Sequence, residues 1–150
     1  MVDNIKFCKI RDVKSPERAH STDAGIDFFI PNDFKATTLK AGEQILIPSG
    51  IKVKFPDGYA LIAFNKSGIA TKKRLASGAC IVDSQYTNEV HIHLHNLGNA
   101  DVELTPGMKI IQFLLMPISS AMPNEISTEE YDLLTAEAER GLGGFGSSGV

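Results

Sequence analysis

The residues best suited to chemistry lie in the last eleven positions and in a few polar interruptions of apolar segments. Residues 140–150 combine glycines and serines with Arg140 and Phe145. Their N–H and hydroxyl groups could wrap an anion, the guanidinium could pair with phosphate oxygens, and the phenyl ring could stack on a flat ring. The same composition is also typical of a disordered terminus, so this segment alone leaves both alternatives open.

Four polar positions elsewhere have both a structural and a chemical interpretation. Asp27 opens an apolar run, either as a turn cap or as a carboxylate facing a metal or a partner subunit. Lys66–Gly68 follow a strand and could bind phosphate, although such turns are common on surfaces. Asp83 could be a positioned base with Tyr86 beside it, or part of an ordinary turn. Gln112 interrupts an apolar strand, so its amide bonds either neighbouring backbone or a ligand.

Three histidines alternate with apolar residues in the segment 90–96. His91, His93 and His95 therefore share one face of the expected strand, and the apolar residues share the other. On a straight strand the outer two lie too far apart for one ion, and neighbouring ligands that would complete a set are missing from the sequence. We expect a polar face at a subunit interface or in solvent rather than a metal site.

The totals describe an ordinary soluble single domain. The net charge of −3 argues against a general nucleic-acid or membrane binder. The N-terminal segment does not resemble a signal peptide, so we expect a cytoplasmic location, with the nucleus or an organelle left open. Cys8 and Cys80 lie in apolar strand-like segments, which predicts buried free thiols.

Short apolar runs separated by Gly and Pro turns predict an all-β sandwich or barrel. The segment 76–90 is typical of a β-hairpin, with Ile81–Val82 in one strand and Val90 in the next. A helical turn is expected near 68–75, and residues 127–134 fit either a capped helix or a polar extended linker. The expected strands include 5–10, 44–48, 50–55, 59–64 and 108–117.

Five segments, in order and at fitting separations, resemble the motifs of the homotrimeric dUTPase family. The resemblance covers residues 24–149. A single motif is weak evidence for the family, but five motifs in the right order and spacing are specific to it. The matching segments are Ala24–Phe28, Lys66–Gly68, Cys80–Tyr86, Gly107–Phe113 and Arg140–Gly149.

The resemblance implies a jelly-roll-like β-clip domain over residues 1–139 and a flexible C-terminal arm over residues 140–150. In that family the first, second and fourth motifs of one subunit meet the third motif of a second subunit and the arm of a third. The implied activity is Mg²⁺-dependent hydrolysis of dUTP to dUMP and pyrophosphate. That reaction keeps uracil out of DNA and supplies dUMP for thymidylate synthesis.

The resemblance also implies a role for each motif residue. Asp83 would activate the water that attacks the α-phosphorus, and Tyr86 would pack under the deoxyribose and exclude ribonucleotides. The backbone from Ser77 to Val82, including Ile81, would read the uracil edge, with His91 near the base or sugar.

The remaining roles concern the phosphates, the metal and the arm. Asp27 would hold waters of a Mg²⁺ bound mainly by the triphosphate. The residues implied to bind the α- and β-phosphates are Lys66, Ser67, Gly68 and Gln112, and those implied to close over the γ-phosphate or the uracil are Arg140, Phe145, Gly146, Ser147 and Ser148.

The chain departs from the family pattern at four points. Met108 and Lys109 replace the usual acid and arginine of the fourth motif, and His91 stands where the family often has an apolar residue. Lys66 replaces the usual arginine and follows Asn65 rather than proline, and a lysine lacks the bidentate fork. Near the pyrimidine, the unusual residues are Cys80, Gln85 and Asn88. These changes keep two alternatives open, namely a pyrophosphatase for a 5-substituted dUTP and a dUTP-binding regulatory protein with little catalysis.

Overall fold

The computed structural model describes residues 5–138, which contain eleven strands and two short helices. The elements are β1 (Lys6–Lys9), β2 (Ile26–Phe29), β3 (Thr37–Leu39), β4 (Gln44–Pro48), β5 (Ile51–Lys54), β6 (Tyr59–Asn65), α1 (Ser67–Lys73), β7 (Leu75–Ser77), β8 (Ile81–Asp83), β9 (His91–Asn96), β10 (Val102–Leu104), β11 (Lys109–Pro117) and α2 (Thr128–Thr135). The chain divides into two compact units between Ser119 and Ser120, and α2 belongs to the second.

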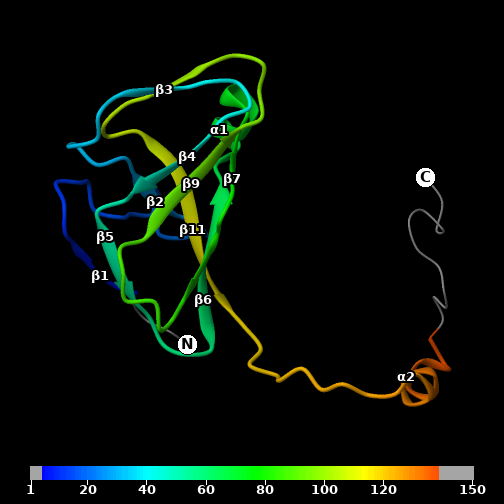
Figure 1. Ribbon diagram of the computed structural model, residues 1–150. Coiled ribbons are helices and arrows are strands. Elements are labelled where there is room, and N and C mark those ends of the chain that lie inside the picture. The colour runs from blue at the N-terminus through cyan, green and yellow to red at the C-terminus, as the bar shows by residue number, and fades with distance from the viewer. Residues whose placement is uncertain (1–4, 139–150) are drawn as a thin grey trace. The chain divides into compact units, whose positions relative to one another are not determined.

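Two antiparallel sheets form the body of the first unit (Figure 1). One has the strand order β2-β11-β6-β8 and the other the order β4-β9-β7. Two further pairs, β1 with β5 and β3 with β10, complete the described strands. The predicted all-β fold is confirmed, and the strand boundaries expected for residues 44–64 agree closely with β4, β5 and β6.

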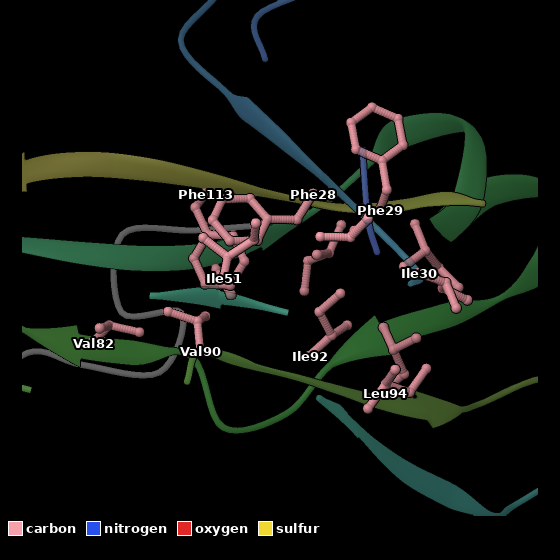
Figure 2. Packing of buried hydrophobic residues seen from close by; sticks show 14 of the residues in the cluster. Phe28, Phe29, Ile30, Ile51, Val82, Val90, Ile92, Leu94 and Phe113 are labelled. Carbon is pink, nitrogen blue, oxygen red and sulfur yellow. The ribbon is translucent and has the colours of Figure 1, made fainter. Parts of the chain in front are cut away.

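The core contains the inward-facing residues of both sheets (Figure 2). Phe28 of β2 and Phe113 of β11 pack with ring centroids 4.5 Å apart. Ile92 and Leu94 of β9 are fully buried, as the alternating pattern of that strand predicts. Each such side chain stabilises the fold by about 1.5–3 kcal/mol relative to an exposed position. The histidines of β9 consequently lie on its other face.

The predicted hairpin at residues 76–90 is wrong. β8 pairs with β6 in one sheet, whereas β9 pairs with β4 and β7 in the other. Between them the amide of Val90 donates to the carbonyl of Ile51 (2.8 Å), so the segment leaves one sheet and enters the next. Period-two alternation shows that a strand exists but does not identify its partner.

The helices and the cysteines give mixed outcomes. α1 is at the expected position. Residues 127–134, expected as either a capped helix or an extended linker, form the helix α2, and the Ser127 hydroxyl at its N-terminus accepts a hydrogen bond from the Glu130 amide (3.2 Å). Both cysteines are free thiols, but Cys8 is exposed because β1 pairs only with β5. Among residues 5–138, no helix is long and apolar enough to cross a membrane.

Candidate active site

A buried carboxylate and two lysines form one end of the candidate site, here called the lysine cluster (Asp27, Lys66 and Lys109). Asp27 of β2 is 3% exposed, and its two oxygens bind different ammonium groups. Oδ1 contacts Nζ of Lys66, and Oδ2 lies 3.0 Å from Nζ of Lys109. Two cations on one carboxylate leave the cluster with net positive charge. The cluster therefore offers an attractive environment for an anion.

Gln112 lies beside the lysine cluster, since it pairs with Asp27 across β11 and β2. Its amide Nε2 donates to the carbonyl of Asn65 (2.8 Å), so it bonds backbone, as one of the two alternatives predicted. Its Oε1 faces Gly25, where an added Cβ would come within 2.1 Å. The missing side chain at Gly25 therefore makes room for the Gln112 carboxamide.

Asp83 ends β8 with an exposed side chain, and the loop after it is held by its own hydrogen bonds. The Tyr86 amide donates to the Asp83 carbonyl (3.0 Å), and the Tyr86 hydroxyl donates to the Glu89 carbonyl (3.0 Å). The His91 Nδ1–H donates to the same carbonyl (2.9 Å). These bonds fix the Tyr86 ring while leaving the Asp83 carboxylate accessible to water.

The two residues after Asp83 bind the turn between β5 and β6 rather than a cavity. The Ser84 hydroxyl and the Gln85 amide both donate to Oδ1 of Asp57, at 2.6 and 2.7 Å. The hydrogen bonds from Ser84 and Gln85 lower the pKa of the Asp57 carboxyl. Gln85 thus binds Asp57, whereas Cys80, another of the unusual residues near the expected pyrimidine, lines a cavity.

That cavity has a volume of about 180 Å³ and lies between the end of β7, β8 and the loop that follows. Five residues singled out from the sequence contribute to its wall, together with apolar side chains of β4 and β11. The complete lining is Leu46, Ala79, Cys80, Ile81, Val82, Tyr86, Val90, His91 and Phe113. A second cavity of about 280 Å³, lined in part by β1 and β2, contains none of the predicted site residues.

The lysine cluster and Asp83 lie at opposite ends of β6. Asp83 pairs with Ala60, near the start of that strand, whereas Lys66 directly follows its last residue. Six residues of extended chain at about 3.3 Å per residue separate these points by about 20 Å. In one copy of the chain, the accessible carboxylate therefore does not reach a phosphate bound at the lysine cluster.

The structure thus divides the predicted site residues into two groups. Lys66, Ser67, Gly68, Gln112 and Asp27 lie at one end of β6. Ile81, Val82, Tyr86 and His91 line the cavity, and Asp83 ends the strand that carries Ile81 and Val82. Ser77 ends β7, and its amide binds Asn65 beside Lys66. The predicted residues Arg140, Phe145, Gly146, Ser147 and Ser148 lie outside the described residues.

Sequence reasoning missed several contributors. Lys109 was noted only as a replacement, although it binds the Asp27 carboxylate. Asn65 joins the two groups, because its Oδ1 accepts from the Ser77 amide (2.7 Å) and its carbonyl accepts from Gln112. Its position directly before Lys66, where proline is usual, was the available signal, since proline has no side-chain acceptor.

The sheet order defines an all-β protein in which the lysine cluster and a cavity lined by several predicted site residues lie apart from each other. The family model for dUTPase matches residues 11–149, and the chain belongs to the dUTPase family. This membership confirms the resemblance drawn from the five motifs.

Curated relatives support the same membership. A deoxyuridine 5'-triphosphate nucleotidohydrolase of Rickettsia felis is 35% identical over 153 residues, covering 99% of both chains. One from Clostridium acetobutylicum is 35% identical over 150 residues, covering 98% of this chain and 97% of the relative. Among solved structures, a Staphylococcus bacteriophage 80alpha dUTPase with dUPNHPP has a TM-score of 0.85 at 23% identity, covering 99% of both chains, which shows the shared fold.

Proposed function

We propose that this chain hydrolyses dUTP to dUMP and pyrophosphate at sites assembled between copies of the chain in a homotrimer. The observation that carries the assembly is the separation of about 20 Å along β6 between Lys66 and the strand position that pairs with Asp83. A second copy can bring its Asp83 to the lysine cluster of the first. We place the reaction in the cytoplasm because deoxynucleoside triphosphates are intracellular substrates. We do not propose nucleic acid or a membrane as a partner of this chain.

Asp83 is the proposed general base. Its carboxylate is exposed and ends a strand whose position is fixed by β6, so a water beside it can be aimed at the α-phosphorus. The proton of that water passes to the carboxylate as the new P–O bond forms and pyrophosphate leaves. Tyr86 packs under the deoxyribose, and its hydroxyl bond to Glu89 keeps the ring from rotating away.

The cavity beside β8 is the proposed pyrimidine subsite. Its volume of about 180 Å³ suits one pyrimidine ring, and its wall includes Ile81, Val82 and His91. Backbone N–H and carbonyl groups between Ser77 and Val82 would read the uracil edge. A 5-substituted dUTP remains the second candidate substrate, because the Cys80 side chain lies in this wall where glycine is usual.

The lysine cluster is the proposed phosphate subsite, together with Gln112. Asp27 holds Lys66 in place before substrate arrives, so little ordering of the ammonium group remains on binding. In the first turn of α1, the amides of Ser67 and Gly68 lack intrahelical partners and are available to phosphate oxygens.

Mg²⁺ would fit this site only when it is coordinated mainly by the triphosphate of the substrate. Both Asp27 oxygens bind lysines, and residues 5–138 contain no group of three His, Cys, Asp or Glu side chains that could hold a metal. Mg²⁺ commonly binds substrate phosphates with one or two carboxylates, and bound there it neutralises phosphate charge. Asp27 can contact its waters only after Lys66 or Lys109 turns to the phosphates.

The C-terminal arm, residues 140–150, completes the proposal. Arg140, Gly146, Ser147 and Ser148 would close over the γ-phosphate, and Phe145 would stack on the uracil. The basis is the motif match, together with the coverage of the family model to residue 149. We propose residues 1–139 as the β domain that this arm serves.

Pyrophosphate release from dUTP, dTTP, dCTP and 5-hydroxymethyl-dUTP, measured side by side with Mg²⁺, tests the function. The proposal expects dUTP to be the best substrate. A preference for 5-hydroxymethyl-dUTP would favour the second candidate, and dUTP binding without pyrophosphate release would favour a regulatory role.

A further inference from the structure

The turn that joins β7 to β8, residues Gly78–Cys80, is held mainly by one residue of β9. The Gly78 amide donates to the His93 carbonyl (3.0 Å), and the Ala79 amide donates to Nδ1 of the His93 ring (2.8 Å). From the other sheet, the Ala63 amide donates to the Cys80 carbonyl (2.8 Å). Of the three bonds, only the one to the imidazole depends on a side chain.

The imidazole of His93 is itself fixed in one tautomer. A backbone amide can only donate, so Nδ1 must be the unprotonated acceptor and Nε2 must carry the hydrogen. That hydrogen points to Oε1 of Gln44 on β4, 2.9 Å away. The ring also packs against His95, with centroids 4.6 Å apart. The neutral ring therefore links β4 to the β7–β8 turn.

The absence of a side chain at Gly78 leaves the room that the rings of His93 and His95 occupy. A Cβ at residue 78 would lie 2.2 Å from Nδ1 of His93 and 2.6 Å from Nε2 of His95. Real Cβ atoms do not approach neighbouring atoms this closely. The two rings thus press directly against the backbone of the turn, and their position determines where the following residues lie.

We propose that His93 is a positioning residue for pyrimidine recognition. This inference rests on the proposed function, because Ser77–Val82 is the segment proposed to read the base. His93 acts through the Ala79 amide rather than by touching the substrate, and it sets the position of the backbone groups that face the pyrimidine edge. Base discrimination depends on such placement, since a displaced donor or acceptor leaves polar groups unpaired.

Two substitutions distinguish the roles of the two nitrogen atoms of the His93 ring. His93→Asn places a carboxamide oxygen near the position of Nδ1 and preserves an acceptor for Ala79, while it loses the contact with Gln44. His93→Gln places its amide near Nε2, keeps the contact with Gln44 and removes the acceptor. The two variants have similar polarity, so each is the matched control for the other.

With His93→Gln we expect the preference for dUTP over dTTP in kcat/KM to fall about tenfold, the equivalent of one lost hydrogen bond. We expect most of this loss in KM rather than kcat, and partial rescue with His93→Asn, within about threefold of the original preference. Equal preferences in the two variants, or a loss confined to kcat, would overturn the proposal.

Hydrogen exchange of the Ala79 amide, followed by NMR in the full chain without nucleotide, tests the bond itself. Exchange should accelerate strongly with His93→Gln and only slightly with His93→Asn, and equal exchange in both would refute the positioning role. This measurement stays valid if the wild-type chain fails to hydrolyse dUTP, so failure of the proposed function is recognised separately.

Gln44→Ala provides a second route if His93→Gln fails to fold. Gln44 is exposed, and its removal releases only the Nε2 side of the ring. We expect faster exchange at Ala79 and a smaller loss of dUTP preference, about threefold. An unchanged exchange rate and an unchanged preference would contradict the proposal.

Discussion

The two ends of β6 are stabilised by different physical means. At the end near Lys66, a buried carboxylate fixes two lysines through charge. At the end near Asp83, neutral hydrogen bonds place the loop after β8. Further along β6, neutral hydrogen bonds and the space left by Gly78 place the β7–β8 turn, whose Cys80 carbonyl accepts from the Ala63 amide. Charge suits a ligand whose negative charge is spread over many oxygens, whereas fixed backbone groups suit a ring whose edge must be read. We therefore expect mutations near Lys66 to change the affinity for dUTP, and mutations at the β7–β8 turn to change the preference for dUTP over dTTP.

Asp83→Asn is expected to have the largest effect. Loss of the general base should reduce kcat by about 10²–10⁴-fold, because the amide cannot accept the proton of the attacking water. Affinity for a non-hydrolysable dUTP analogue should change little. Pyrophosphate release and calorimetric binding measure the two quantities, with Asp132→Asn on α2 as the carboxylate control. A kcat within threefold of wild type would exclude Asp83 as the base.

Asp27→Asn should weaken the fold at the phosphate end. The substitution leaves two ammonium groups beside an uncharged amide, and we expect the free energy of unfolding to fall by about 2 kcal/mol. The value is below that of fully buried pairs because both lysines are partly exposed, at 21% and 39%. Urea denaturation measures it, and Lys109→Met, which preserves the contact of Asp27 with Lys66, should cost less. An unchanged midpoint would show that the cluster does not stabilise the fold.

Two glycine substitutions contrast the ends most directly. Gly25→Ala would push aside the flexible Gln112 carboxamide and should raise KM for dUTP about tenfold, with dUTP preference over dTTP unchanged. Gly78→Ala would push against two imidazoles and should lower that preference. Steady-state kinetics with both nucleotides distinguishes the variants. The same pattern of change in both would contradict the division into an affinity end and a discrimination end.

Glu89→Gln should have the smallest effect, and one that depends on pH. Burial raises the pKa of the Glu89 carboxyl, but hydrogen bonds from Arg11 (2.9 Å) and the Gly50 amide (2.7 Å) outweigh it and hold the pKa below its ordinary value. Its folded-state pKa is depressed, so its stabilisation is present above the ordinary value of 4.5 and is lost as pH falls through the lower folded-state pKa.

At pH 7 we therefore expect Glu89→Gln to lower the free energy of unfolding by about 1 kcal/mol, discounted because Arg11 is exposed. The difference from wild type should shrink below pH 4.5. Denaturation at pH 7 and at pH 3.5 measures it. A difference that grows on acidification would contradict the sign.

The sequence was sufficient to predict most of the strands and the family, whereas the short strands β3 and β7 were not expected. Alternation in residues 90–96 and the turns around Gly42 and Gly58 are local signals, and the structure has strands and positive-φ glycines at these places. Partner choice is not local. Ile81–Val82 and Val90 were joined in one hairpin because they are close in sequence, yet β8 and β9 belong to different sheets.

The site was predictable where a motif residue acts by its own chemistry. Asp83, Lys66 and Gln112 were singled out as candidates, and their catalytic and binding roles stay predictions. His93 was expected only as part of a polar face, because its role comes from meeting Ala79 in space. Cys8 was expected to be buried because it has apolar neighbours in a strand-like segment, but every residue of β1 is exposed, and Cys80 is only partly buried.

We propose that one copy of the chain contributes Asp83 to each site and another copy contributes the lysine cluster. Mixing of two variant subunits tests this arrangement. Asp83→Asn chains and Lys66→Met, Gln112→Ala chains should each be inactive as homotrimers. After unfolding and refolding together in equal amounts, each shared site has an independent one-half chance of an intact Asp83 and of an intact cluster, so about a quarter of wild-type activity should return. Activity no greater than that of the two variants refolded separately would contradict a site shared between copies.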